Sequence, residues 1–86
     1  MAALTSLERI DRGREAKRLL GDPLLQGAFA GVKAGIIAQW ETATDTQTRE
    51  NLWAALHGSN RIEIWLNGLV EDGVIAQRAA ELDANE

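Results

Sequence analysis

The sequence predicts an all-α protein, and three observations support this class. Large apolar residues recur at helical spacing in the second quarter of the chain, where they step by three or four positions: Leu25, Phe29, Val32, Ile36 and Trp40. Start and stop signals for helices separate the segments. Only residues 61–68 alternate like a strand, and an isolated two-stranded hairpin is marginal in water. We therefore expect a short N-terminal helix, an antiparallel hairpin of two long helices and a short C-terminal helix.

The first helix is expected to begin after Thr5 and to run to about Leu20. Thr5 followed three residues later by Glu8 is a capping-box pattern. The apolar stripe is shallow and consists of Ile10, Gly13, Ala16 and Leu20. Charged pairs at helical spacing occupy the other faces, Glu8 with Arg12 and Glu15 with Arg18. This pattern predicts a loosely docked helix with a solvated face.

The second helix is expected to start near Pro23 and to span about 20 residues, close to 30 Å. Gly21 ends the first helix, Asp22 caps the next, and Pro23 fits its first turn. Opposite the large apolar stripe lie two rows of small residues, Gly27, Gly31, Gly35 and Ala30, Ala34, Ala38. Each interior glycine costs about 1 kcal/mol relative to alanine, so we expect another backbone to approach this face closely. The helix is then buried on two sides, one against its own core and one against a partner such as a second copy.

The third helix is expected to begin after a polar loop over residues 41–48, with Thr44 or Thr46 as its cap. We expect it to continue to Asp72, to end at Gly73, and to be followed by a short helix over residues 74–82. Residues 58–60, Gly-Ser-Asn, are a candidate break, and the Asn-Gly that ends residues 61–68 is a hairpin signal. The core stripe comprises Ile62, Leu66 and Leu69.

The 86 residues fit one domain, 1–86, whose ends 1–5 and 83–86 are expected to fray. With no cysteine and a single histidine, His57, neither disulfides nor most metal sites are available, and we expect no metal and no cofactor. The net charge of −4 disfavours general binding to nucleic acid. Residues 9–18 are nevertheless mildly positive, which leaves a local anion or acidic-partner patch open.

Neither a secretory signal nor a membrane-spanning helix is expected. The N-terminus has no basic start followed by an apolar run. Residues 23–40 are long enough to span a bilayer, but Lys33 lies near their middle, where a charge costs roughly 2.5 to 3.5 kcal/mol.

No constellation of residues predicts an enzyme. Ser6 and Ser59 have no recognisable base, and the glycines have the wrong spacing for a phosphate-binding loop. The adjacent Glu71 and Asp72 would point about 100° apart on a helix, so we interpret them as surface charges, like Asp45.

Two candidate interfaces follow from the aromatic and basic residues. Tryptophan is enriched both in cores and at binding hot spots. Trp40 and Trp53 flank the loop and are expected to pack together, whereas Trp65 points away from the core stripe and is the preferred anchor. The second candidate surface is basic and consists of Arg12, Arg14, Lys17 and Arg18, with a solvated face as its alternative interpretation.

Several short motifs resemble a family of small helical proteins whose genes lie among the head and packaging genes of tailed phages and prophages. The matching residues are Ile10-Asp11-Arg12-Gly13-Arg14, Leu19-Leu20, Asp22, the aliphatic run to Trp40, Arg49-Glu50, Leu52-Trp53, Leu56, Glu71-Asp72-Gly73 and Ala76. The glycine row at 27, 31 and 35 is not part of this pattern. The resemblance implies a virion-assembly or virion-structural setting and supplies no mechanism.

From these observations we expect a non-enzymatic phage structural or assembly accessory that binds capsid, portal or connector proteins in multiple copies and forms a homo-oligomer. Its expected location is the virion, with the host cytoplasm before assembly. One alternative is a small phage-encoded inhibitor of a host protein. Another is a DNA-packaging accessory that uses the basic first helix.

Overall fold

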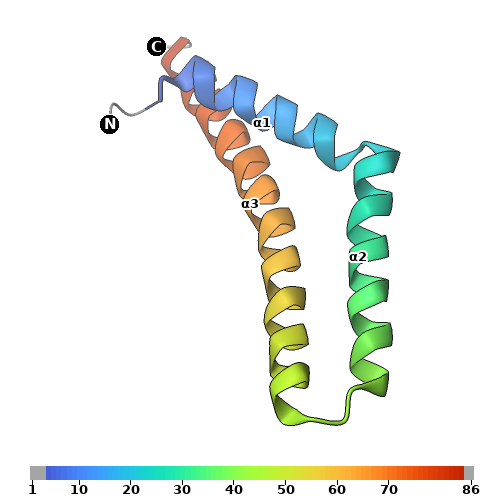
Figure 1. Cartoon of the computed structure of the whole chain (residues 1–86). Helices are drawn as coiled ribbons and strands as arrows, with labels where there is room; N and C mark the ends of the chain where they lie inside the picture. The colour runs from blue at the N-terminus through green and yellow to red at the C-terminus, as the bar shows by residue number, and fades with distance from the viewer. Residues whose placement is uncertain (1–3, 85–86) are drawn as a thin grey trace.

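The computed structural model describes residues 4–84 and shows three helices, α1 (Ser6–Leu20), α2 (Pro23–Thr42) and α3 (Thr46–Ala84). No strand occurs in this part of the chain, so the predicted all-α class is confirmed for it. The molecule is elongated, with extents of 63 × 28 × 19 Å. In Figure 1, α2 lies beside the first half of α3, and α1 packs across the second half.

Helix α1 begins and ends at the predicted signals. The Thr5 hydroxyl accepts a hydrogen bond from the Glu8 backbone N–H at 3.1 Å, and the Glu8 carboxylate accepts one from the Thr5 N–H at 3.3 Å. Gly21 caps the C-terminus and donates its N–H to the carbonyl of Lys17. Asp22 then caps α2 by accepting from the N–H groups of Leu24 and Leu25. These caps at Gly21 and Asp22 fix the boundary between α1 and α2.

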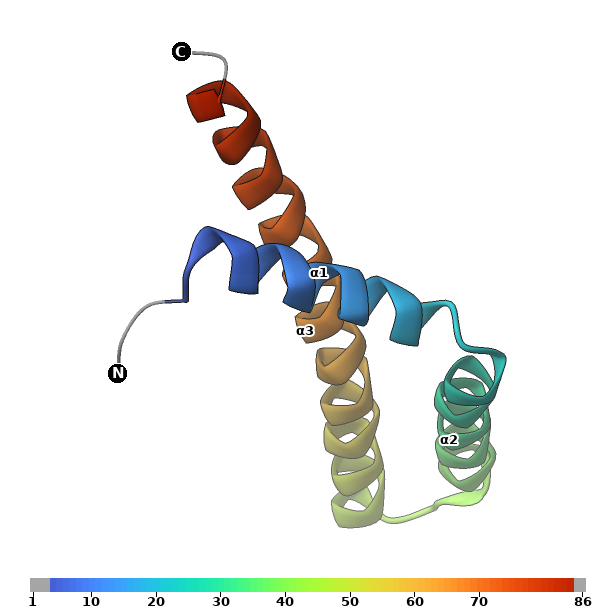
Figure 2. The ribbon, with the colours of Figure 1, turned by 90° about the horizontal axis from the view of Figure 1, so that it is seen from above.

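The crossing of α1 over α3 is closer than the shallow stripe predicted. Gly13 and Gly73 face each other, and a Cβ added to Gly13 would lie 2.9 Å from the Leu69 carbonyl oxygen and 3.0 Å from the Gly73 Cα. A Cβ on Gly73 would lie 3.2 Å from the Arg9 carbonyl oxygen. The prediction of a loosely docked first helix is therefore wrong. Figure 2 shows α1 passing obliquely over α3 at this point.

Helix α3 is a single helix, which corrects three expectations about its course. It does not break at residues 58–60, it does not end at Gly73, and the separate short helix over residues 74–82 is its own continuation. Gly73 is buried at the crossing instead. Asp45, and neither Thr44 nor Thr46, supplies the N-terminal cap, because its carboxylate accepts from the Thr48 N–H at 2.8 Å. At the ends, Thr5 is ordered as the α1 cap and α3 reaches Ala84; residues 1–3 and 85–86 lie outside the described range.

The hydrophobic core is small. Its buried apolar residues are Ala16, Phe29, Leu66 and Ala76, and partly buried leucines and Val70 surround them. Ile62, which was expected in the core stripe, is 54% exposed. Within the described residues Phe29 is the one buried residue of α2, on the side that faces the core. Burial of its other side against a partner stays a prediction. Much apolar surface therefore faces outward.

Candidate functional site

The candidate site is a set of exposed apolar and basic surfaces. Across residues 4–84 there is no group of three or more histidines, cysteines or carboxylates that could hold a metal ion. Within the same residues, no helix is long and apolar enough to cross a membrane. Lys33, which argued against a spanning helix, forms an ion pair with Glu63 of α3, with 2.7 Å between Nζ and Oε1.

The predicted small-residue face of α2 is open within the chain. Built Cβ atoms on Gly27, Gly31 and Gly35 would meet no other atom within 4 Å. The neighbouring alanines, Ala30, Ala34 and Ala38, are exposed as well. No element within residues 4–84 provides the close backbone approach that the spacing predicts, so such an approach by another molecule stays a prediction.

An apolar crevice of about 300 Å³ lies between α2 and α3 beside the loop that joins them. It is lined by Ile36, Ile37, Trp40, Leu52, Trp53 and Leu56. Trp40 and Trp53 thus border one hollow, although Trp53 is 60% exposed. The Arg49 guanidinium lies 3.7 Å from the centroid of the Trp40 ring and donates to the Ala43 carbonyl, which holds this ring in place. The crevice is suited to receive an apolar side chain from a partner.

The second predicted interface divides into two flanks of α1. On one flank, the Arg12 guanidinium lies 5.9 Å from the centroid of the Trp65 ring, so the structure brings these two predicted residues together. Trp65 is 59% exposed, so its ring is accessible to a partner, and its role as an anchor stays a prediction. On the other flank, Arg14 and Lys17 line a separate crevice against α3. Arg18 forms the predicted ion pair with Glu15.

An ion pair that the sequence pattern missed fixes α1 on α3. Arg9 donates from Nε to Asp72 Oδ2 at 3.0 Å and from Nη2 to Oδ1 at 2.7 Å. This hydrogen-bonded guanidinium holds the pKa of Asp72 below its ordinary value. The partners are far apart in sequence, so helical spacing gave no signal for the pair. Asp72 therefore holds two helices together and is more than the surface charge predicted above.

Acid should loosen the α1–α3 contact through Asp72. Because the pKa of Asp72 is depressed in the folded chain, the pair stabilises the fold above the unfolded pKa, and this stabilisation is lost as pH falls through the lower folded pKa. We expect the melting temperature to fall on acidification below the ordinary aspartate range. Asp72→Asn should lower the melting temperature at neutral pH and make its decline in acid shallower. Circular dichroism melts across pH test this, and an equally steep acid decline in Asp72→Asn would assign the decline to other carboxylates.

His57 takes no part in a catalytic or ligand arrangement that the structure shows. Its ring lies 3.9 Å from that of Trp53, centroid to centroid, at a tilt of 42°. Asp45 is occupied by capping α3, and the hydrogen bonds from Thr48 lower its pKa.

Comparisons of the chain with models of protein families, with curated proteins and with solved structures found no match.

Proposed function

We propose that the protein is a non-enzymatic accessory of phage virion structure or assembly, which binds capsid, portal or connector proteins in multiple copies. The observation that carries this proposal is the exposure of large apolar side chains. All three tryptophans are exposed by 44% or more, whereas few apolar residues are buried. Burial of apolar surface stabilises by about 25 cal/mol per Å², so a chain that leaves such residues in water gains by binding a partner.

The phage setting is supported by the resemblance of the segment between Ile10 and Ala76 to small helical proteins of head and packaging gene modules. We further propose that α2 and α3 work together as an antiparallel hairpin whose loop end carries the contact. The apolar crevice between them has almost no polar lining, and Trp53 stands exposed at its edge. A host-protein inhibitor and a DNA-packaging accessory remain the rival functions, and the net charge of −4 disfavours the latter.

Mass spectrometry of purified particles tests the proposal. We expect the protein in the particles at a copy number that matches the symmetry of a ring or shell. Deletion of its gene should reduce the yield of complete particles. If the protein is absent from particles, assembly is normal without it, and it co-purifies with a host protein in equal amounts, the inhibitor function replaces the structural one.

A matched pair of variants locates the contact. Trp53 and Ile75 are exposed to nearly the same degree, 60% and 61%, but only Trp53 borders the apolar crevice. We expect Trp53→Ala to reduce the amount of protein in particles by about tenfold, as loss of a hot-spot tryptophan does, and Ile75→Ala to have little effect. Equal losses in both variants would move the contact away from the loop end.

A further inference from the structure

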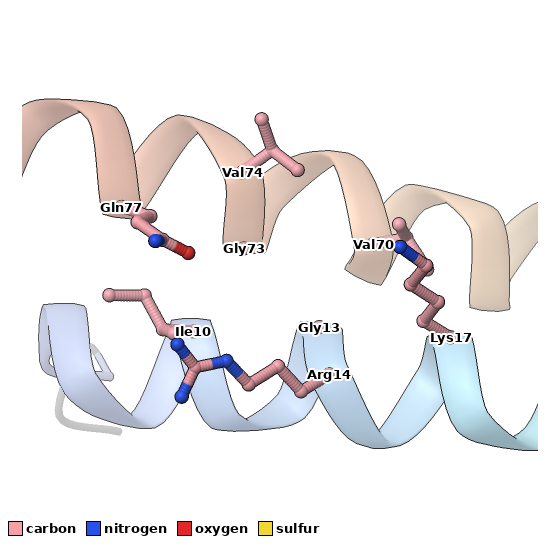
Figure 3. A pocket seen from close by; sticks show the side chains of 8 residues that line it. All are labelled: Ile10, Gly13, Arg14, Lys17, Val70, Gly73, Val74 and Gln77. Carbon is pink, nitrogen blue, oxygen red and sulfur yellow. The ribbon is translucent and has the colours of Figure 1, made fainter.

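We propose that the crevice at the α1–α3 crossing is a docking site for an acidic, partly apolar segment of a partner protein. This crossing crevice has a volume of about 200 Å³ and surrounds the Gly13–Gly73 contact. Its lining side chains are Ile10, Arg14, Lys17, Val70, Val74 and Gln77, and Figure 3 shows them projecting from both helices around the glycine pair.

The charge of the crossing crevice is the first argument for an acidic occupant. Its lining contains two cations and no carboxylate. Five of the nine basic side chains are paired or stacked: Arg9 with Asp72, Arg18 with Glu15, Lys33 with Glu63, Arg12 on Trp65 and Arg49 on Trp40. Arg61 and Arg78 are not among them, but neither lines the crossing crevice. Arg14 and Lys17 have no carboxylate within 4.0 Å anywhere in residues 4–84. A chain of net charge −4 thus leaves two neighbouring cations unpaired in one hollow.

The crossing crevice continues along α3 into a hollow that adds one cation and one carboxylate. A second hollow shares Val74 and Gln77 with the crossing crevice and is also lined by Arg78 and Glu81. Arg78 likewise has no ion-pair partner within the described residues. The groove therefore extends over more than one turn of α3, which suits a peptide segment better than a single small anion. Its far end carries the one carboxylate, that of Glu81.

The apolar lining of the crossing crevice favours a protein segment over a nucleic acid as its occupant. Ile10, Val70 and Val74 offer aliphatic surface, and Val74 is 47% exposed. A phosphate backbone gains nothing from such surface, and two cations neutralise few phosphates. A protein segment gains from both features, since its carboxylates pair with Arg14 and Lys17 while a leucine-like side chain covers the valines. The occupant we infer therefore presents a glutamate or aspartate close to an aliphatic residue.

The crossing crevice is held open by its backbone and needs little rearrangement to bind. Gly13 and Gly73 set the distance between the two helices, and the Arg9–Asp72 pair fixes α1 on the opposite flank. A preformed hollow binds with less ordering cost than a mobile one. This inference rests on the proposed function only in assuming that the protein binds other proteins.

A fluorescent amphipathic peptide of glutamate and leucine is the probe for the crossing crevice. We expect it to bind the full chain, and its addition should shift the backbone NMR signals of residues 10–17 and 70–78. Binding should weaken with added salt, as expected for exposed charges. A peptide with glutamine in place of each glutamate, and another with serine in place of each leucine, should each bind at least about tenfold more weakly.

Arg14→Glu is the test variant and Arg61→Glu its matched control, since both reverse an exposed cation on a helix but Arg61 lies outside the crevice. We expect Arg14→Glu, and separately Lys17→Glu, to weaken peptide binding about tenfold, and Arg61→Glu to change it by less than about twofold. Circular dichroism checks that each variant is folded. Equal weakening in Arg14→Glu and Arg61→Glu, or shifts confined to other residues, would overturn the proposal.

Two further probes distinguish other occupants. Tighter binding of duplex DNA or of inorganic phosphate than of the acidic peptide, lost in Arg14→Glu, would replace the peptide by a phosphate ligand and overturn the proposal. Peptide binding tests the crossing crevice, and presence in particles tests the proposed function, so the two can fail independently. A protein found in particles that does not bind the peptide refutes the crevice alone, whereas peptide binding by a protein absent from particles refutes the virion assignment alone.

Discussion

Gly13→Leu is expected to detach α1 from α3 and to cost most of the stability of this small fold. The Gly13 position allows no side chain, because even a Cβ would lie 2.9 Å from the Leu69 carbonyl oxygen and 3.0 Å from the Gly73 Cα. Both obstacles are backbone atoms of a long helix, so neither can move aside as a side-chain end would. Overpacking costs about 1 to 3 kcal/mol in ordinary cores, and we expect the upper end of that range or more here. Thermal and urea unfolding followed by circular dichroism measure the loss.

The control for this change is Gly58→Ala. Gly58 lies inside α3, and a Cβ there would meet nothing within 4 Å, so alanine should raise stability by about 0.5 to 1 kcal/mol. Gly13→Ala is the milder test variant and should lower stability although alanine favours helix. If Gly13→Ala and Gly58→Ala both stabilise the protein, the two helices are free to separate at the crossing and the close contact has little energetic weight.

The sequence singled out the glycine row of α2, whose contact with another molecule stays a prediction, but it missed the glycine pair that packs α1 on α3. The glycines at 27, 31 and 35 are conspicuous because they recur at regular spacing within one helix. Gly13 and Gly73 belong to different helices and are 60 positions apart in the sequence, so no local pattern connects them. Spacing shows which residues share a helical face, and it does not show which face another helix meets. The stripe of Gly13 and Ala16 on α1 was predicted, and both residues are buried. Its partner on α3 carried no local signal.

Gly73 shows why the end of α3 was misplaced. A glycine that follows Glu71 and Asp72 favours a helix stop by local propensity. The penalty for a glycine inside a helix is about 1 kcal/mol, and close packing of α1 on α3 offsets it. Local signals succeeded where the chain really turns, at Thr5, Gly21 and Asp22, because capping depends on residues a few positions apart. Contacts between distant residues, such as Lys33 with Glu63, were beyond such reasoning.

The candidate surfaces were predicted only in part, because helical spacing gives the exposure of a residue on one helix but not the position where two helices cross. Exposure of Trp65 follows from its angle to Leu66 on one helix, and the structure agrees, with 59% and 8% exposure respectively. Division of the basic residues into two flanks depends on where α1 crosses α3, which helical spacing alone does not specify. Only the crossing places Arg12 beside Trp65 and puts Arg14 with Lys17 in the crossing crevice.

Gly31→Leu is expected to abolish self-association without harming the fold. Within the described residues a Cβ added at Gly31 would meet nothing within 4 Å. Leucine also has a higher helix propensity than glycine, which costs roughly 1 kcal/mol in a helix interior. The melting temperature of the monomer should therefore stay the same or rise. If a second copy approaches this face, each new leucine separates the two backbones. Overpacking by a leucine costs about 1 to 3 kcal/mol, and a two-fold interface contains two copies of the new leucine. We therefore expect the affinity of self-association to fall by at least about tenfold.

Sedimentation velocity over a range of concentrations distinguishes the possible contact faces. The wild type should form an oligomer that Gly31→Leu converts to a monomer. Trp65→Ala, on the exposed flank beside Arg12, serves as the comparison for a contact outside α2. An oligomer that survives Gly31→Leu but dissociates in Trp65→Ala would place the self-contact on the α1–α3 flank. A wild type that is monomeric at all concentrations would leave the open glycine face to a different protein. In that case the measurement is the amount of the Gly31→Leu variant that purified particles contain. We expect less of it than of the wild type, because the leucine would prevent the backbone of a partner from approaching this face.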